Sequence, residues 1–150
     1  MNNNEVISTL NSLTETCRRG QNGFRSAAES IQNSEFRRLF NIFSQQRAQF
    51  MTELQSEVHR LGGELNKGEE RMTLPSNTLP FRSSTTAKTV GVRNEVTIIA
   101  ECQREEETAV NDYQEALKAD LPLDVQYVVK RQYMDIKDAY DRIRILQRAA

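Results

Sequence analysis

Apolar residues recur every three or four positions along four long segments of this 150-residue chain, a spacing typical of one buried face of an α-helix. The first run extends from Val6 to Ile31 and the second from Phe36 to Leu61. The third extends from Val92 to Leu117 and the fourth from Val125 to Leu146. No segment shows a competing strand pattern. The periodicity therefore predicts an all-α fold with helices at about residues 4–32, 35–62, 88–119 and 122–148.

The connections between these segments predict the topology. A cap at Asn33 leaves only a short turn between the first two helices, so they must lie antiparallel. Gly62 and Gly63 end the second helix. The loop that follows, about residues 63–88, is long enough to run the length of a helix of about 42 Å. We therefore expect a single four-helix-bundle domain over residues 1–150, with one long crossover between helices 2 and 3, the ferritin-like arrangement. An up-down-up-down bundle with a loose loop is the alternative.

Charge and composition exclude several classes of function. The chain has 20 Lys and Arg against 21 Asp and Glu, so its formal net charge of −1 favours neither nucleic acid nor an anionic membrane as partner. The sequence begins without a signal-peptide pattern and has no run of about 20 apolar residues, so we expect a cytoplasmic protein. Its single histidine, His59, lies on the polar face of the second helix and leaves no Ser-His or Cys-His arrangement for nucleophilic catalysis.

Polar residues interrupt the apolar face of three helices near their centres. Arg47 lies between Phe43 and Phe50, and the other interruptions are Gln103, Glu106 and Gln132. Helices of similar length bring these positions to one level, so we expect a central polar layer in which Arg47 pairs with Glu106 and the two glutamines take the remaining hydrogen bonds. The layer would set the register of the helices or be the remnant of a ligand site; alternatively, Arg47 extends into a surface groove.

Several segments resemble a bacterial ferritin-like family of four-helix bundles described as a conserved domain of unknown function. The resemblance covers all four helices and rests on residues 23–29, 61–64, 101–107, 113–117, 121–125 and 131–133. The crossover departs from it, because residues 73–89 lack the His and Trp of other members, and Tyr140 stands where they tend to have His. The resemblance implies a ferritin-like fold and no established activity.

The expected function is that of a non-enzymatic bundle, a stress-associated or scaffold protein without a cofactor, catalytic residues or metal ligands. Leu123, Tyr127 and Met134 form a second apolar stripe on helix 4, which predicts a homodimer. A metal-binding oxidoreductase or iron-handling protein with a degenerate carboxylate site is the alternative, with Glu29, Glu101, Glu105 or Glu106 as its ligands. Another is a carrier that encloses a small ligand. Cys17 and Cys102 lie at similar heights and are expected to behave as buried hydrophobic residues rather than as a redox pair.

Overall fold

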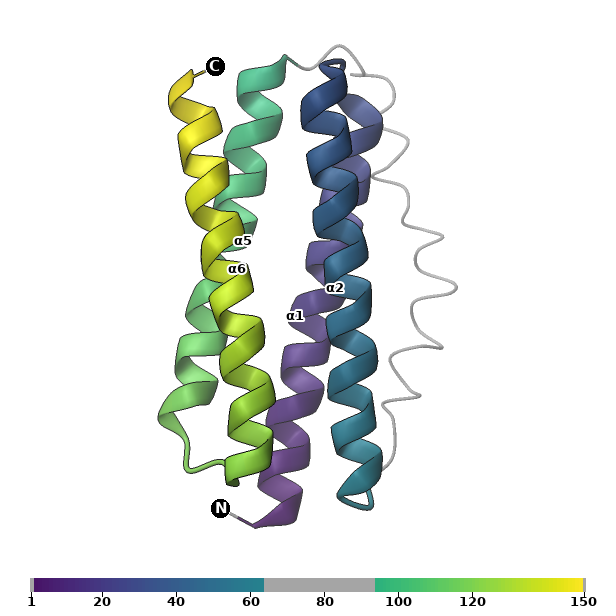
Figure 1. The fold of residues 1–150 in the computed structure, drawn as a ribbon, viewed down its shortest axis with the longest axis vertical. Coiled ribbons are helices and arrows are strands. Elements are labelled where there is room, and N and C mark those ends of the chain that lie inside the picture. Colours follow the sequence, from purple (N-terminus) through teal and green to yellow (C-terminus); the bar gives the residue numbers. More distant parts are fainter. Residues whose placement is uncertain (1, 64–93, 150) are drawn as a thin grey trace.

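The computed structural model describes residues 2–63 and 94–149 as four long helices, and no strand occurs among these residues (Figure 1). Helix α1 spans Asn3–Ser30, α2 spans Ser34–Arg60, α5 spans Glu95–Lys118 and α6 spans Leu123–Ala149. The prediction of an all-α bundle is confirmed. None of these helices is long and apolar enough to cross a membrane.

Side-chain caps and one glycine fix the helix ends. Asn2 and Glu5 form a reciprocal capping box at the start of α1, and Asn33 accepts hydrogen bonds from two backbone amides in the first turn of α2. Gly62 ends α2 at φ +86, a backbone conformation that residues with a Cβ rarely adopt. Asn94 caps α5, which begins at Glu95; the earlier predicted start, at residue 88, falls outside the described residues.

The end of α1 differs from the prediction. The helix stops at Ser30, and Ile31 is extended, so the predicted continuation to residue 32 is wrong. The buried Ile31 side chain anchors the chain against the core, and Asn33 already serves as the cap of α2. The turn between the two helices must therefore be made within residues 31–33.

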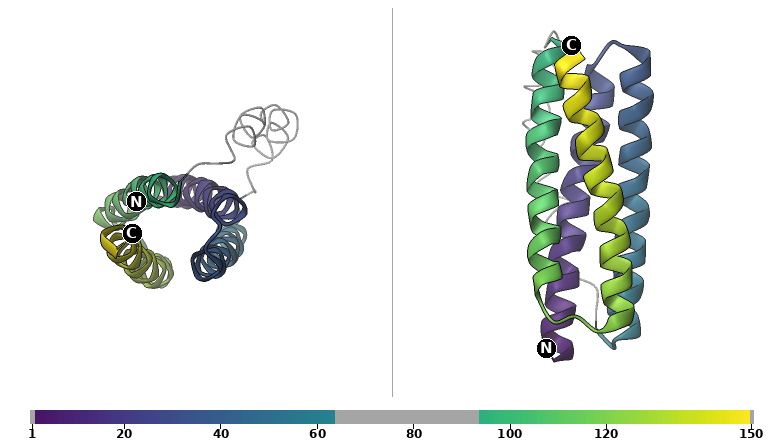
Figure 2. Two further views of the ribbon diagram at one scale, coloured as in Figure 1. Left: turned by 90° about the horizontal axis from the view of Figure 1, so that it is seen from above. Right: turned by 60° about the vertical axis from the view of Figure 1, so that its left-hand side comes forward.

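The four helices are arranged up, down, down, up (Figure 1). Helix α2 ends at the opposite end of the bundle from the start of α5, so these two helices run parallel, which confirms the crossover arrangement over the up-down-up-down alternative. Helix α1 packs against α2 and α5, and α6 packs against α5 and α2, so α2 and α5 occupy opposite corners (Figure 2).

The hydrophobic core is divided into two clusters along the bundle axis. One cluster contains Leu10, Cys17, Phe50 and Val110, and the other contains Phe24, Phe43, Cys102 and Ile143. On α1, α2 and α5 the boundary between the clusters falls at Gly20, Arg47 and Glu106. The polar centre of the bundle is therefore bounded by apolar packing on both sides.

Candidate functional site: a buried polar centre

An ion pair crosses the diagonal of the bundle. Nη1 of Arg47, on α2, donates to Oε1 of Glu106, on α5, at 2.7 Å, and Nη2 of the same guanidinium donates to Oε2. Both residues are fully buried, with side-chain exposures of 0% and 1%. A two-pronged contact between ionised groups is the geometry best able to offset the desolvation of both charges.

Helix α1 makes room for this pair. A Cβ atom built on Gly20 would lie 3.0 Å from Nη1 of Arg47, so the guanidinium occupies the space that a larger residue would fill. The Cζ atom of Arg47 lies 5.2 Å from the centre of the Phe24 ring, within the range of a cation-π interaction. The Arg47 Nε–H finds no hydrogen-bond partner. Small size at Gly20 and an aromatic face at Phe24 therefore shape the pocket that holds the cation.

The electrostatics of the pair keep Arg47 charged. Burial acts to lower the pKa of the guanidinium, but the charge and hydrogen bonds of the adjoining Glu106 carboxylate outweigh burial and raise this pKa above its ordinary value. The central cation is therefore permanent at physiological pH.

A second group of hydrogen bonds lies next to the ion pair and links all four helices. The Tyr113 hydroxyl donates to Oε1 of Gln132 at 2.7 Å and lies 3.1 Å from Sγ of Cys17. Nε2 of Gln132 donates to Oε1 of Glu53 at 2.8 Å, and Nη2 of Arg131 donates to the same oxygen at 3.0 Å. The chain of contacts thus runs from a buried thiol to a partly exposed guanidinium. It joins α6 to α2, which are the least closely packed of the neighbouring helices (Figure 2).

The thiol and the phenol of this second network are held in their neutral forms. Burial raises the pKa of the Cys17 thiol to about 11, although its hydrogen bond with Tyr113 and the nearby Arg47 charge act to lower it. Burial, followed by the influence of Cys17, raises the pKa of Tyr113 well above its usual range. Since the reactive form of cysteine is the thiolate, Cys17 is a poor nucleophile at neutral pH.

The structure divides the four residues predicted to form one layer. Arg47 and Glu106 are bonded to each other, whereas Gln132 bonds to Tyr113, to Glu53 and to the Phe50 carbonyl. Gln103 is only half-buried, and its Oε1 atom has no hydrogen-bond partner. The expectation that both glutamines would complete the hydrogen bonds of the ion pair is therefore wrong. The reason is geometric. Glu106 accepts hydrogen bonds from both terminal nitrogens of Arg47, and neither glutamine side chain reaches the Nε of Arg47.

The predicted site omitted Tyr113, Glu53 and the role of Cys17. Tyr113 belongs to the regular apolar run of the third segment, so its ring suits the core. A buried tyrosine hydroxyl nevertheless needs a partner, and this requirement was the available signal for Gln132. The sequence contains no such signal for Glu53. A glutamate on a polar flank of a helix fits the pattern equally well with or without a neighbouring α6.

The centre does not fit the di-iron sites of ferritin-like bundles, which need a Glu from each of two helices and Glu-x-x-His from each of the other two. At this level α1 contributes Gly20, which has no side chain to bind a metal, and α2 contributes the positive charge of Arg47. The Glu106 carboxylate is already paired with Arg47. His59 is exposed, as expected from its place on the polar face of α2, and the candidate ligands Glu29 and Glu105 are exposed as well. Among residues 2–63 and 94–149, no three His, Cys, Asp or Glu side chains gather closely enough to share a metal ion.

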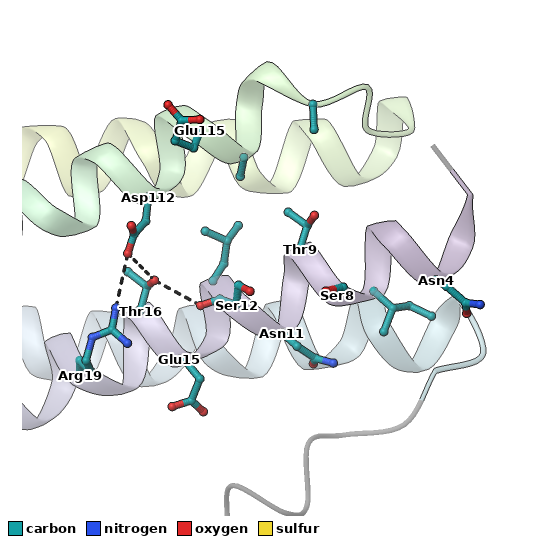
Figure 3. Close-up of a pocket in the computed structure, with 14 residues that line it drawn as sticks. Asn4, Ser8, Thr9, Asn11, Ser12, Glu15, Thr16, Arg19, Asp112 and Glu115 are labelled. Atoms are coloured by element: carbon teal, nitrogen blue, oxygen red, sulfur yellow. Dashed lines mark hydrogen bonds and ion pairs between the residues drawn. The ribbon is translucent and has the colours of Figure 1, made fainter.

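Two grooves open between α1 and α5 on the outside of the bundle. The larger, of about 760 Å³, has a mixed polar and apolar lining in which Asp112 accepts from the Thr16 hydroxyl at 2.8 Å and from Nη2 of Arg19 at 3.4 Å (Figure 3). The smaller, of about 470 Å³, reaches down to Phe24, Cys102 and Glu106. These contacts tie α1 to α5 beside the buried centre.

Comparison with known proteins places this geometry in a family. A family model described as "Domain of unknown function (DUF2383)" matches residues 5–119. A crystal structure of a two-domain protein from Anabaena variabilis ATCC 29413, with DJ-1/ThiJ/PfpI-like and ferritin-like domains, is similar to the chain with a TM-score of 0.76 and 15% sequence identity. The match covers 99% of this chain and 37% of that protein, and at this identity it supports the fold alone. No curated protein matches the chain. The chain therefore belongs to the DUF2383 family and has a ferritin-like four-helix-bundle fold.

Proposed function

We propose that this protein works without a metal centre, as a scaffold or interaction protein built on a ferritin-like bundle. The observation that carries the proposal is the position of Arg47. Its guanidinium lies at the centre of the bundle, where metal ligands would have to converge. Among residues 2–63 and 94–149, Glu106 is the only buried carboxylate bonded to it. A divalent cation placed there would face a fixed positive charge in a medium of low dielectric constant, where charge repulsion is strong.

The surface of α6 supports an interaction role. Leu123, Tyr127 and Met134 point away from the core with exposures of 79%, 69% and 64%. Large apolar side chains that gather on one face are typical of a protein–protein contact. The proposal therefore assigns the interior of the bundle to stability and the outer face of α6 to binding.

Metal analysis tests the first half of the proposal. The protein is purified without chelator, incubated anaerobically with Fe²⁺ or Mn²⁺ and desalted. Elemental mass spectrometry then gives the number of metal ions per chain. We expect much less than one metal ion per chain in both the purified and the incubated protein. One or more ions per chain, held inside the bundle by Glu106, would overturn the proposal in favour of an iron-handling protein.

Two matched variants locate any metal that binds. Glu106→Gln removes the buried carboxylate, and Glu105→Gln removes its exposed neighbour on the same helix. Binding that Glu106→Gln abolishes and Glu105→Gln preserves would establish a degenerate site inside the bundle. Binding that follows Glu105 instead would place the ion on the surface and leave the metal-free interior as proposed.

A further inference from the structure

The outer face of α6 carries a longer apolar stripe than the three residues named so far. Ile145 is 60% exposed and extends the stripe toward the C-terminal end of the helix. At 3.6 residues per turn, the four positions share one side of α6, opposite the side that enters the core. The core side carries Val125, Val129, Gln132, Ile136, Ala139 and Ile143.

The two ends of the stripe are equidistant from Met134. Leu123 lies 11 residues before Met134 and Ile145 lies 11 residues after it, and 11 residues are about three turns of an α-helix. Each end is therefore about 16 Å from the centre along the axis. If a second α6 runs in the opposite direction with its Met134 against this one, Leu123 of each copy lies level with Ile145 of the other. Such a contact is isologous, the kind that two-fold dimers use.

The charges beside the stripe favour the same orientation. Antiparallel docking about Met134 brings Lys130 of one copy level with Asp138 of the other, and Asp124 level with Arg144. These two oppositely charged combinations outnumber the one of like charge, in which Arg131 comes level with Lys137. A parallel arrangement in register sets every charged residue level with its own copy.

Most of these charges are already occupied within one chain, but weakly. Arg131 contacts Glu53 at 3.0 Å, Lys137 lies 3.6 Å from Asp141, and Arg142 lies 3.0 Å from Asp138. The Lys137–Asp141 and Arg142–Asp138 pairs are exposed, and exposed pairs contribute little to stability. Lys130 has no ion-pair partner in the part of the chain that the structure describes.

We propose that the occupant of this face is a second copy of the same chain, docked antiparallel along α6 with Met134 on the two-fold axis. This inference rests on the proposed interaction role and names its partner. Eight large apolar side chains, four from each copy, leave water together, and Tyr127 of each copy comes level with Asp141 of the other, which can accept a hydrogen bond from the phenol.

Sedimentation equilibrium of the full chain tests self-association. We expect a species of twice the 17.3 kDa chain mass, and we expect Met134→Lys to return it to the monomer while circular dichroism stays unchanged. Asn111→Lys is the matched control, because it adds the same charge at an exposed position on α5, and it should remain dimeric. A wild-type monomer at every concentration, or a dimer that Met134→Lys leaves intact, overturns the inference.

Cysteine cross-linking tests the orientation. Cys17 and Cys102 are buried, so newly placed surface cysteines report alone. Leu123→Cys protein mixed with Ile145→Cys protein should form a disulfide-linked heterodimer on mild oxidation, and Leu123→Cys by itself should not cross-link. Efficient cross-linking of Leu123→Cys to itself would show parallel docking and overturn the antiparallel assignment.

The two proposals fail in different assays. A monomeric protein that binds no metal removes the second copy as partner and leaves the metal-free bundle standing. A dimer with one metal ion per chain that depends on Glu106 removes the metal-free proposal and leaves the α6 contact standing.

Discussion

Gly20 and Arg47 share one packing site on opposite sides of a helix interface. A Cβ atom on Gly20 would come within 3.0 Å of Nη1 of Arg47, while a Cβ atom on Gly23, one turn further along α1, would meet nothing within 4 Å. The guanidinium cannot move aside easily, since Glu106 holds both of its terminal nitrogens. Contact with Arg47 therefore accounts for the small residue at position 20, and no such contact exists at Gly23 among the described residues.

Replacing each glycine by alanine should show whether a methyl group is tolerated at position 23 but not at position 20. Alanine stabilises a helix interior by about 1 kcal/mol relative to glycine. We expect Gly23→Ala to raise the free energy of unfolding by about that amount, and Gly20→Ala to lower it, because the methyl group displaces Arg47. Urea unfolding measures both. Equal stabilisation by the two variants would show that the guanidinium has room to spare.

Removing one partner of the buried ion pair should be more harmful than removing both. We expect Arg47→Met to lower the free energy of unfolding by roughly 3–5 kcal/mol, because Glu106 is left buried without its counter-charge. The double variant Arg47→Met/Glu106→Leu should recover most of this loss, since apolar residues of similar size replace the pair. Chemical denaturation of the wild type, Arg47→Met, Glu106→Leu and the double variant completes the double-mutant cycle. An Arg47→Met protein as stable as the wild type would contradict the buried geometry.

The Tyr113 hydroxyl should matter because two buried groups depend on it. Tyr113→Phe leaves Oε1 of Gln132 without this donor and removes the contact with Cys17, so we expect a loss of about 1–3 kcal/mol. Tyr133→Phe is the matched control, since the Tyr133 hydroxyl accepts a hydrogen bond from Gln114 at the surface. It should change the free energy of unfolding by less than about 0.5 kcal/mol. Similar effects from the two variants would argue against a buried network.

Stability should fall at alkaline pH. Cys17 and Tyr113 are neutral when protonated, and folding raises the pKa of both, that of Cys17 from 9.0 to about 11. Below pH 9 the folded and unfolded chains both hold these protons, so the full stabilisation is present. Between pH 9 and pH 11 the unfolded chain releases the Cys17 proton first, and roughly 2–3 kcal/mol is lost.

The variant Cys17→Ser isolates the contribution of the thiol. Serine can still bond to Tyr113 but does not titrate in this range. Unfolding by urea at pH 8 and pH 10.5 should show a smaller loss for the variant than for the wild type, and the surface groups titrate equally in both. The same loss in the two proteins would mean that Cys17 is accessible to solvent.

The regular spacing of apolar residues predicted the helices and the two-sided core, because burial alone decides those positions. The length of the loop after Gly63 predicted that the second and third helices run parallel. Both signals lie in short stretches of the sequence, so one sequence is enough to predict the helices and their order.

The hydrogen bonds of the centre were less predictable. Heptad position placed Gln132 inside the bundle, but which helix corner faces Arg47 depends on small rotations of each helix. Gln103 illustrates the limit: it occupies an apolar position by spacing, yet it is half-buried and does not join the ion pair. Contacts across a diagonal depend on all four helices at once, which no local pattern encodes.

The two core clusters that meet at Arg47 and Glu106 give the bundle two ends with separate interiors. Apolar contacts continue within each cluster, whereas the junction is held by hydrogen bonds and one ion pair. One end of the bundle can therefore loosen, exchanging its amide protons with solvent, while the other end stays folded. The ion pair at the junction then limits how far local unfolding spreads along the helices.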